Sequence, residues 1–109
     1  MAQFAILLYA PAPADWSETP QDELEAHGTF AEKIGELGGS IVTGYALQPS
    51  SGAKAVRSDG VTDGPLIDAK EVLGGITVIE ARDLDHAVEI AKESPGTWRG
   101  GVEVRELLG

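Results

Sequence analysis

The sequence contains no cysteine in its 109 residues. Disulfide bonds, thiol catalysis and zinc sites built on thiolates are therefore excluded. Basic residues are also scarce, because 8 Lys and Arg face 18 Asp and Glu, which gives a formal net charge of −10. Binding to a phosphate backbone or to an anionic membrane surface needs a basic patch. Neither nucleic acid nor a membrane is therefore an expected partner.

The chain also lacks a long apolar run. Gln3–Tyr9 is apolar over the length of a strand and has no basic residues before it, so we interpret it as a strand and not as a signal peptide. No segment approaches the ~20 apolar residues of a membrane span. The length suits one core, and we expect a single cytoplasmic domain over residues 1–109.

What the chain does contain is an alternation of strand-like and helix-like segments. Four segments are typical of strands, namely Gln3–Tyr9, Ser40–Gln48, Gly75–Glu80 and Gly101–Leu107. Helices are predicted from Thr19-Pro20 to about Leu37, and over Leu84–Glu93 behind the capping residue Asp83. A small hairpin is predicted over Ala53–Arg57 and Gly60–Thr62, and one helical turn over Ile67–Val72.

This order predicts an α+β fold with a ferredoxin-like βαββαβ plan and an extra small hairpin. Two helices cover only one face of a four-stranded sheet. The first strand is apolar on both faces, so we expect its second face to be covered as well. A second copy of the chain is the simplest cover, which predicts a homodimer formed through the sheet faces.

His27 is the best candidate for chemistry. It lies in the apolar stripe of the first predicted helix, which is formed by Leu24, Phe30, Ile34 and Leu37. A neutral imidazole in a pocket acts as base or acid near pH 7. The pattern by itself favours the plainer alternative, in which His27 is a buried histidine satisfied by backbone or carboxylate partners. The second histidine, His86, lies among polar residues and is predicted to be solvated.

Asp63 is the second candidate, within the turn sequence Asp63-Gly64-Pro65. Its carboxylate either caps this turn through its own backbone or, in a pocket, orients His27 or contacts substrate. Trp16, in a proline-rich loop, either closes the core edge or forms a pocket wall. Neither a metal-ligand cluster nor a phosphate loop, dinucleotide fingerprint or nucleophile elbow is recognisable, so we expect no metal and no cofactor.

The run Ser58–Leu66, followed by Ala69–Gly75, resembles the signature of the DGPF-domain branch of the YCII-related family. Leu66 stands where that branch has phenylalanine. The last strand and the early strand, loop and helix with a histidine also resemble the family, over nearly the whole chain. The resemblance implies a dimeric α/β barrel with a His–Asp pair in a pocket, matched here by His27 and Asp63. One relative removes chloride from a chlorinated hydroxyquinol, and some DGPF domains are linked to extracytoplasmic-function sigma factors.

Two functions follow as hypotheses. The first is a small cofactor-independent enzyme in which His27 is the acid or base and Asp63 orients it. It would catalyse an elimination of the dehydrochlorinase kind, or an isomerisation, on a small phenolic or enolisable compound, in a cavity shaped by Tyr9, Trp16, Tyr45 and Leu66. The second is a non-catalytic module that binds a small molecule or a partner protein, with a regulatory role. Cofactor-free monooxygenases share the implied fold and are a third possibility at that level alone.

Overall fold

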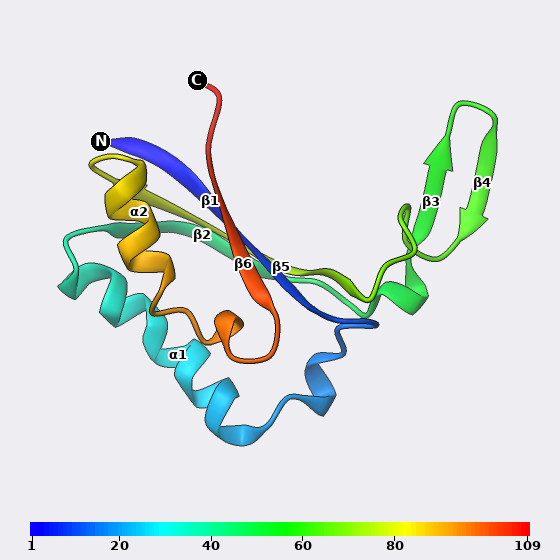
Figure 1. Cartoon of the computed structure of the whole chain (residues 1–109), viewed down its shortest axis with the longest axis horizontal. Helices are drawn as coiled ribbons and strands as arrows, with labels where there is room; N and C mark the ends of the chain where they lie inside the picture. Colours follow the sequence, from blue (N-terminus) through cyan, green and yellow to red (C-terminus); the bar gives the residue numbers. More distant parts are fainter.

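The computed structural model describes residues 1–109 and contains one four-stranded sheet and one separate hairpin (Figure 1). The four strands pair antiparallel in the order β2-β5-β1-β6. Their bounds are β1 Ala2–Pro11, β2 Ser40–Ala46, β5 Glu71–Ala81 and β6 Gly101–Glu106. The helices are α1 Gln21–Glu36 and α2 Leu84–Ala91. The predicted α+β fold with ferredoxin-like strand order is confirmed, whereas the dimeric barrel stays a prediction.

The core lies between the helices and one face of the sheet. Both helices lie on the same side of the sheet (Figure 1). Side chains alternate between the two faces of a strand, and Phe4 and Ile6 of β1 point toward the helices. They are buried together with Ile79 of β5, Ile34 of α1 and Ile90 of α2. The apolar run of the first strand and the positions Phe30 and Ile34 of the predicted helical stripe belong to this layer.

The inward stripe of α1 differs from the predicted one. Its buried side chains are Glu23, Phe30 and Ile34, and His27 is half-buried between them. Leu24, which was predicted to face inward, is exposed. The spacing of four, three and four residues places Glu23 and not Leu24 on the inner face. A carboxylate therefore occupies an inward position because it has a specific partner, described below.

The segment after the hairpin is extended. The predicted helical turn at Ile67–Val72 is wrong, because β5 already begins at Glu71. Val72 pairs with Ala10 and Leu73 with Tyr9 on β1, so strand pairing decides the local conformation. The register between β1 and β5 shifts at Gly74, and the register between β2 and β5 shifts between Ile41 and Thr43.

His86 is buried, with a relative exposure of 5%, so the prediction that it is solvated is wrong. Its Nε2 donates to the carbonyl oxygen of Leu37 over 2.6 Å, at the end of α1. Its Nδ1 accepts from the Arg82 N–H over 3.0 Å. Asp83 caps α2 as predicted, by accepting from the His86 N–H. His86 thus joins the end of one helix to the start of the other, a role that its polar neighbours in sequence conceal.

The hairpin consists of β3 Lys54–Arg57 and β4 Gly60–Asp63 and matches the prediction. It projects from the end of β2 and β5 away from the body, on the side of the sheet opposite to the helices (Figure 1). The molecule measures 44 × 36 × 19 Å along its principal axes. Three short 3₁₀ helices complete the chain: η1 Trp16–Glu18, η2 Ser50–Gly52 and η3 Pro95–Thr97. No helix is long and apolar enough to cross a membrane.

Candidate functional site

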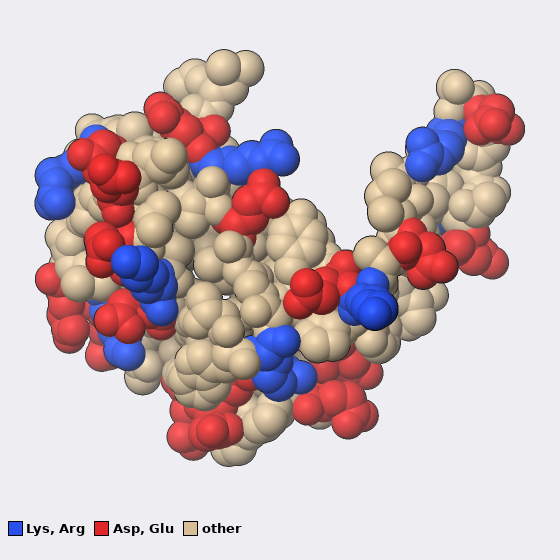
Figure 2. Space-filling model, in the orientation of Figure 1, with Lys and Arg blue, Asp and Glu red and all other residues tan.

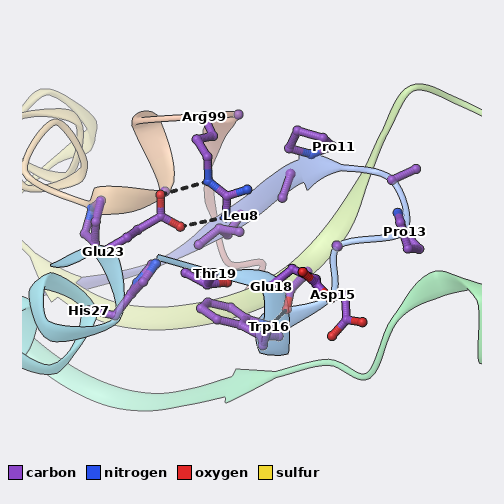
Figure 3. Close-up of a pocket in the computed structure, with 17 residues that line it drawn as sticks. Leu8, Pro11, Pro13, Asp15, Trp16, Glu18, Thr19, Glu23, His27 and Arg99 are labelled. Atoms are coloured by element: carbon purple, nitrogen blue, oxygen red, sulfur yellow. Dashed lines mark hydrogen bonds and ion pairs between the residues drawn. The ribbon is translucent and has the colours of Figure 1, made fainter. Parts of the chain in front are cut away.

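A cavity of about 230 Å³ lies where the end of β1 meets the loop before α1, the first two turns of α1, and the segment between η3 and β6 (Figure 3). Its volume lies below the range of about 300–1,000 Å³ that is typical of ligand pockets, which restricts it to a small molecule. The polar and aromatic side chains in its wall are those of Asp15, Trp16, Glu18, Thr19, Glu23, His27 and Arg99. They come from three separate segments of the chain.

Glu23 and Arg99 form a bidentate ion pair in this wall (Figure 3). Arg99 Nε donates to Glu23 Oε1 over 3.0 Å, and Arg99 Nη2 donates to Glu23 Oε2 over 2.9 Å. The Glu23 side chain is only 8% exposed, whereas that of Arg99 is 45% exposed. The hydrogen bonds from Arg99 lower the pKa of the Glu23 carboxyl, although burial opposes this shift. The pair therefore stays ionised and joins α1 to the segment after η3.

His27 lies one helical turn after Glu23 and faces the same cavity. Burial lowers the pKa of its imidazole below the usual value of 6.5; the Glu23 carboxylate opposes this shift and Arg99 adds to it. A neutral imidazole has one nitrogen with a free lone pair, so it can accept a proton from a bound molecule at neutral pH. The position combines access from the cavity with enough burial to keep the ring uncharged.

Trp16 holds the other side of the imidazole. The centroids of the Trp16 and His27 rings lie 5.0 Å apart at an interplanar angle of 70°, an edge-to-face contact. Trp16 Nε1 donates to the carbonyl oxygen of Gly74 over 3.0 Å, at the register shift of β5. Asp15 accepts from the Ser17 hydroxyl and also from the Ser17 N–H, which caps η1, and these two hydrogen bonds lower the pKa of the Asp15 carboxyl. The indole is thereby fixed in place beside His27.

Two glycines allow the cavity wall to close. A Cβ atom on Gly100 would lie 2.0 Å from the carbonyl oxygen of Tyr9, and one on Gly96 would lie 2.7 Å from Leu8 Cδ1. Only glycine permits such a close approach of the chain to β1. The close approach of Gly100 to β1 positions the neighbouring Arg99 for its contact with Glu23.

The structure brings together only part of the predicted site. Trp16 and His27 meet in the cavity, which agrees with the predicted role of Trp16 as a pocket wall. Asp63 lies on β4, pairs with Lys54 and has a side chain that is 86% exposed. It does not line the cavity of its own chain, nor do the other residues predicted to shape it, Tyr9, Tyr45 and Leu66.

Sequence reasoning missed Glu23 and Arg99 as site residues. Glu23 lies in the first turn of α1, where the helix dipole is enough to explain an acidic residue, and Arg99 lies in a turn without a recognisable motif. One signal was available, because Glu23 and His27 are four residues apart and so share a helix face. No group of three or more His, Asp or Glu side chains is placed to hold a metal ion.

A comparison with protein families matches residues 2–108 to the YCII-related domain. The chain belongs to the YCII-related family. The match covers almost the whole chain, so the family predicted from the sequence is confirmed, and the run Asp63-Gly64-Pro65 is compatible with its DGPF branch. No curated protein sequence matches this YCII-related chain.

Proposed function

We propose that this YCII-related protein is a small cofactor-independent enzyme that uses His27 to move a proton on a phenolic or enolisable compound. One observation carries the proposal. A half-buried imidazole with a lowered pKa faces a small cavity and is fixed against Trp16. Groups whose pKa is shifted by burial within a cleft are enriched at catalytic sites.

His27, Glu23 and Arg99 have separate roles in the proposed reaction. His27 takes a proton from a C–H or O–H group of the bound compound, and the electron pair left behind forms a new double bond. The Glu23 carboxylate stabilises the imidazolium formed, because it lies one turn away in a buried setting. In an isomerisation His27 returns the proton to another atom, whereas in an elimination a group such as chloride leaves with its electron pair. The Arg99 N–H groups that do not contact Glu23 are available to the developing anion.

Asp63 takes part in the proposed site only if it comes from a second copy of the chain. In its own chain it pairs with Lys54 on the projecting hairpin. A His27–Asp63 pair would therefore form between two chains. Chains carrying His27→Ala mixed with chains carrying Asp63→Ala would recover activity in part, because one kind of mixed dimer keeps one intact pair.

We also propose a homodimer through the sheet faces. The face of the sheet away from the helices carries Ala5, Leu7, Ile76, Val78 and Tyr45, which are cross-strand neighbours on β1, β5 and β2. Tyr45 is largely exposed. A sheet that is apolar on both faces is usually covered on both. A second copy offers the same apolar face in return.

The alternative is a non-catalytic module that binds a small molecule. The observation that favours it is that Glu23 and Arg99 satisfy each other, so neither is free to act as an acid or base on a bound compound. The two functions differ in a measurable way. An enzyme turns over its ligand, whereas a binding module only gains stability from it.

The experiment compares wild type with His27→Phe, which keeps an aromatic ring against Trp16 but removes the proton acceptor. Small phenols, quinols and carbonyl acids are screened by thermal shift. Compounds that bind are then followed by NMR for incorporation of solvent deuterium and for product. We expect turnover in wild type to fall at least a hundredfold in the variant, while binding persists.

The pH profile gives a second readout. Because neutral His27 is the base, kcat/KM should rise with pH through a pKa below 6.5 and then level off. Binding without turnover in wild type would establish the binding module instead. Equal turnover by the two proteins would remove His27 from the mechanism.

A further inference from the structure

The chain exposes more surface than a compact monomer of its mass. Its accessible surface is 6943 Å². The size scaling for monomers of 11.4 kDa gives roughly 5,800 Å², about 1,100 Å² less. Its radius of gyration is 14.7 Å, against roughly 13 Å for a compact domain of this length. We attribute the excess accessible surface to particular parts of the molecule and infer that a partner covers them.

The hairpin Lys54–Asp63, which we call the arm, is one of these parts. Its two strands pair with each other and are not part of the main sheet. Isolated two-stranded hairpins are marginally stable in water at best. Val56 and Val61 are directly paired across the arm and are 69% and 63% exposed. An apolar cross-strand pair in this position stabilises the arm fully only when something packs against it.

The arm borders an open hollow on the surface of the molecule (Figure 2). Figure 1 shows the arm rising from the end of the sheet on the side away from the helices, and Figure 2 shows an open notch between arm and body. The open face of the sheet, which carries Leu7, Ile76 and Val78, lies on the same side of the molecule as the arm (Figure 1). Two apolar surfaces thus lie on the same side of the molecule.

We propose that the arm packs against a second copy of this chain, seated on the open sheet face, so that each copy of the dimer is held by the arm of the other. The inference rests on the proposed homodimer and adds a contact surface to it. A standard interface buries about 800 Å² on each partner. The excess surface of each chain, about 1,100 Å² by the size scaling, is enough to supply that area.

Charge favours a second copy over an unrelated partner. The chain carries a net charge of −10, so two copies repel unless their contact surfaces are close to neutral. On the arm, the ion pair Lys54–Asp63 shares its face with the two valines and cancels. On the open sheet face, Arg105 pairs with Glu103 over 2.5 Å. Glu80 adds one negative charge near the end of this face, so both surfaces carry little net charge on an acidic molecule.

The test is sedimentation velocity over a dilution series of the full chain. The double variant Val56→Lys/Val61→Lys is compared with Thr62→Lys, which adds lysine to the opposite face of the arm. We expect wild type and Thr62→Lys to dimerise with similar Kd and the double variant to dimerise at least tenfold more weakly. Added lysines lower the net negative charge, so general electrostatics act in the other direction. Circular dichroism establishes that each variant is folded.

Hydrogen exchange of the wild-type chain gives a result that needs no variant. Amides of β3 and β4 should exchange rapidly at concentrations where the chain is monomeric and slowly where it is dimeric. A dimer with unchanged Kd in the double variant, or with arm amides that stay unprotected, would overturn the arm contact and leave the sheet-face dimer standing. A wild type that is monomeric throughout would overturn both. A monomeric wild type would also exclude the His27–Asp63 pair between chains, whereas proton transfer by His27 itself is tested separately by the turnover experiment.

Discussion

At the residue scale, the ion pair between Glu23 and Arg99 is asymmetric, because Glu23 is buried and Arg99 is partly exposed. Removing either partner should therefore cost different amounts. Arg99→Gln leaves a buried carboxylate without its cation and should cost about 2–3 kcal/mol of unfolding free energy. Glu23→Gln leaves an arginine that water can reach and should cost about 1 kcal/mol. Urea denaturation at pH 7 measures both.

The double variant Glu23→Gln/Arg99→Gln completes the cycle. We expect it to be more stable than Arg99→Gln alone, because the buried charge has been removed together with its partner. If the two single variants lose the same stability, Glu23 is better hydrated than its burial suggests.

The pH dependence of the stability of Arg99→Gln gives a separate test. Without the hydrogen bonds that lower its pKa, Glu23 should take up a proton at higher pH than in wild type.

At the element scale, the site depends on the close approach of the segment after η3 to β1. Gly100→Ala would place a Cβ atom 2.0 Å from the backbone of Tyr9, whereas nothing lies within 4 Å of a Cβ atom on Gly101. Gly101→Ala is thus a matched control one residue away. We expect Gly100→Ala to cost about 1–3 kcal/mol of unfolding free energy, as overpacking does, and Gly101→Ala much less. Thermal denaturation of the two variants measures the difference.

The substitution Gly100→Ala should also affect ligand binding in the cavity. Arg99 precedes Gly100, so a displaced backbone weakens its bidentate contact with Glu23. A ligand found by thermal shift should bind Gly100→Ala more weakly than Gly101→Ala. Equal stability and equal binding in the two variants would mean that the segment relaxes freely and does not position Arg99.

At the scale of the whole molecule, the order of elements was predictable, because it depends on local patterns. Apolar runs of strand length, helical spacing and the Asp83 cap each act over a few residues. The site was predictable only in part. His27 follows from its helix face, but Arg99 reaches Glu23 across 76 residues of sequence. Asp63 was grouped with His27 by resemblance, and the register of the hairpin instead pairs it with Lys54. Contacts between distant segments leave little trace in one sequence.

The net charge of the whole molecule leads to a last prediction, on the proposed dimer. Two chains of charge −10 repel each other, and salt screens this repulsion over a distance of about 8–10 Å at 0.1–0.15 M. The proposed contact surfaces are apolar or carry little net charge, so there are few attractive charge pairs between copies for salt to weaken. Raising the salt concentration from about 0.02 M to about 0.3 M should therefore tighten the dimer severalfold. Sedimentation at the two concentrations measures Kd, and a dimer that weakens with salt would instead be held by ion pairs between the chains.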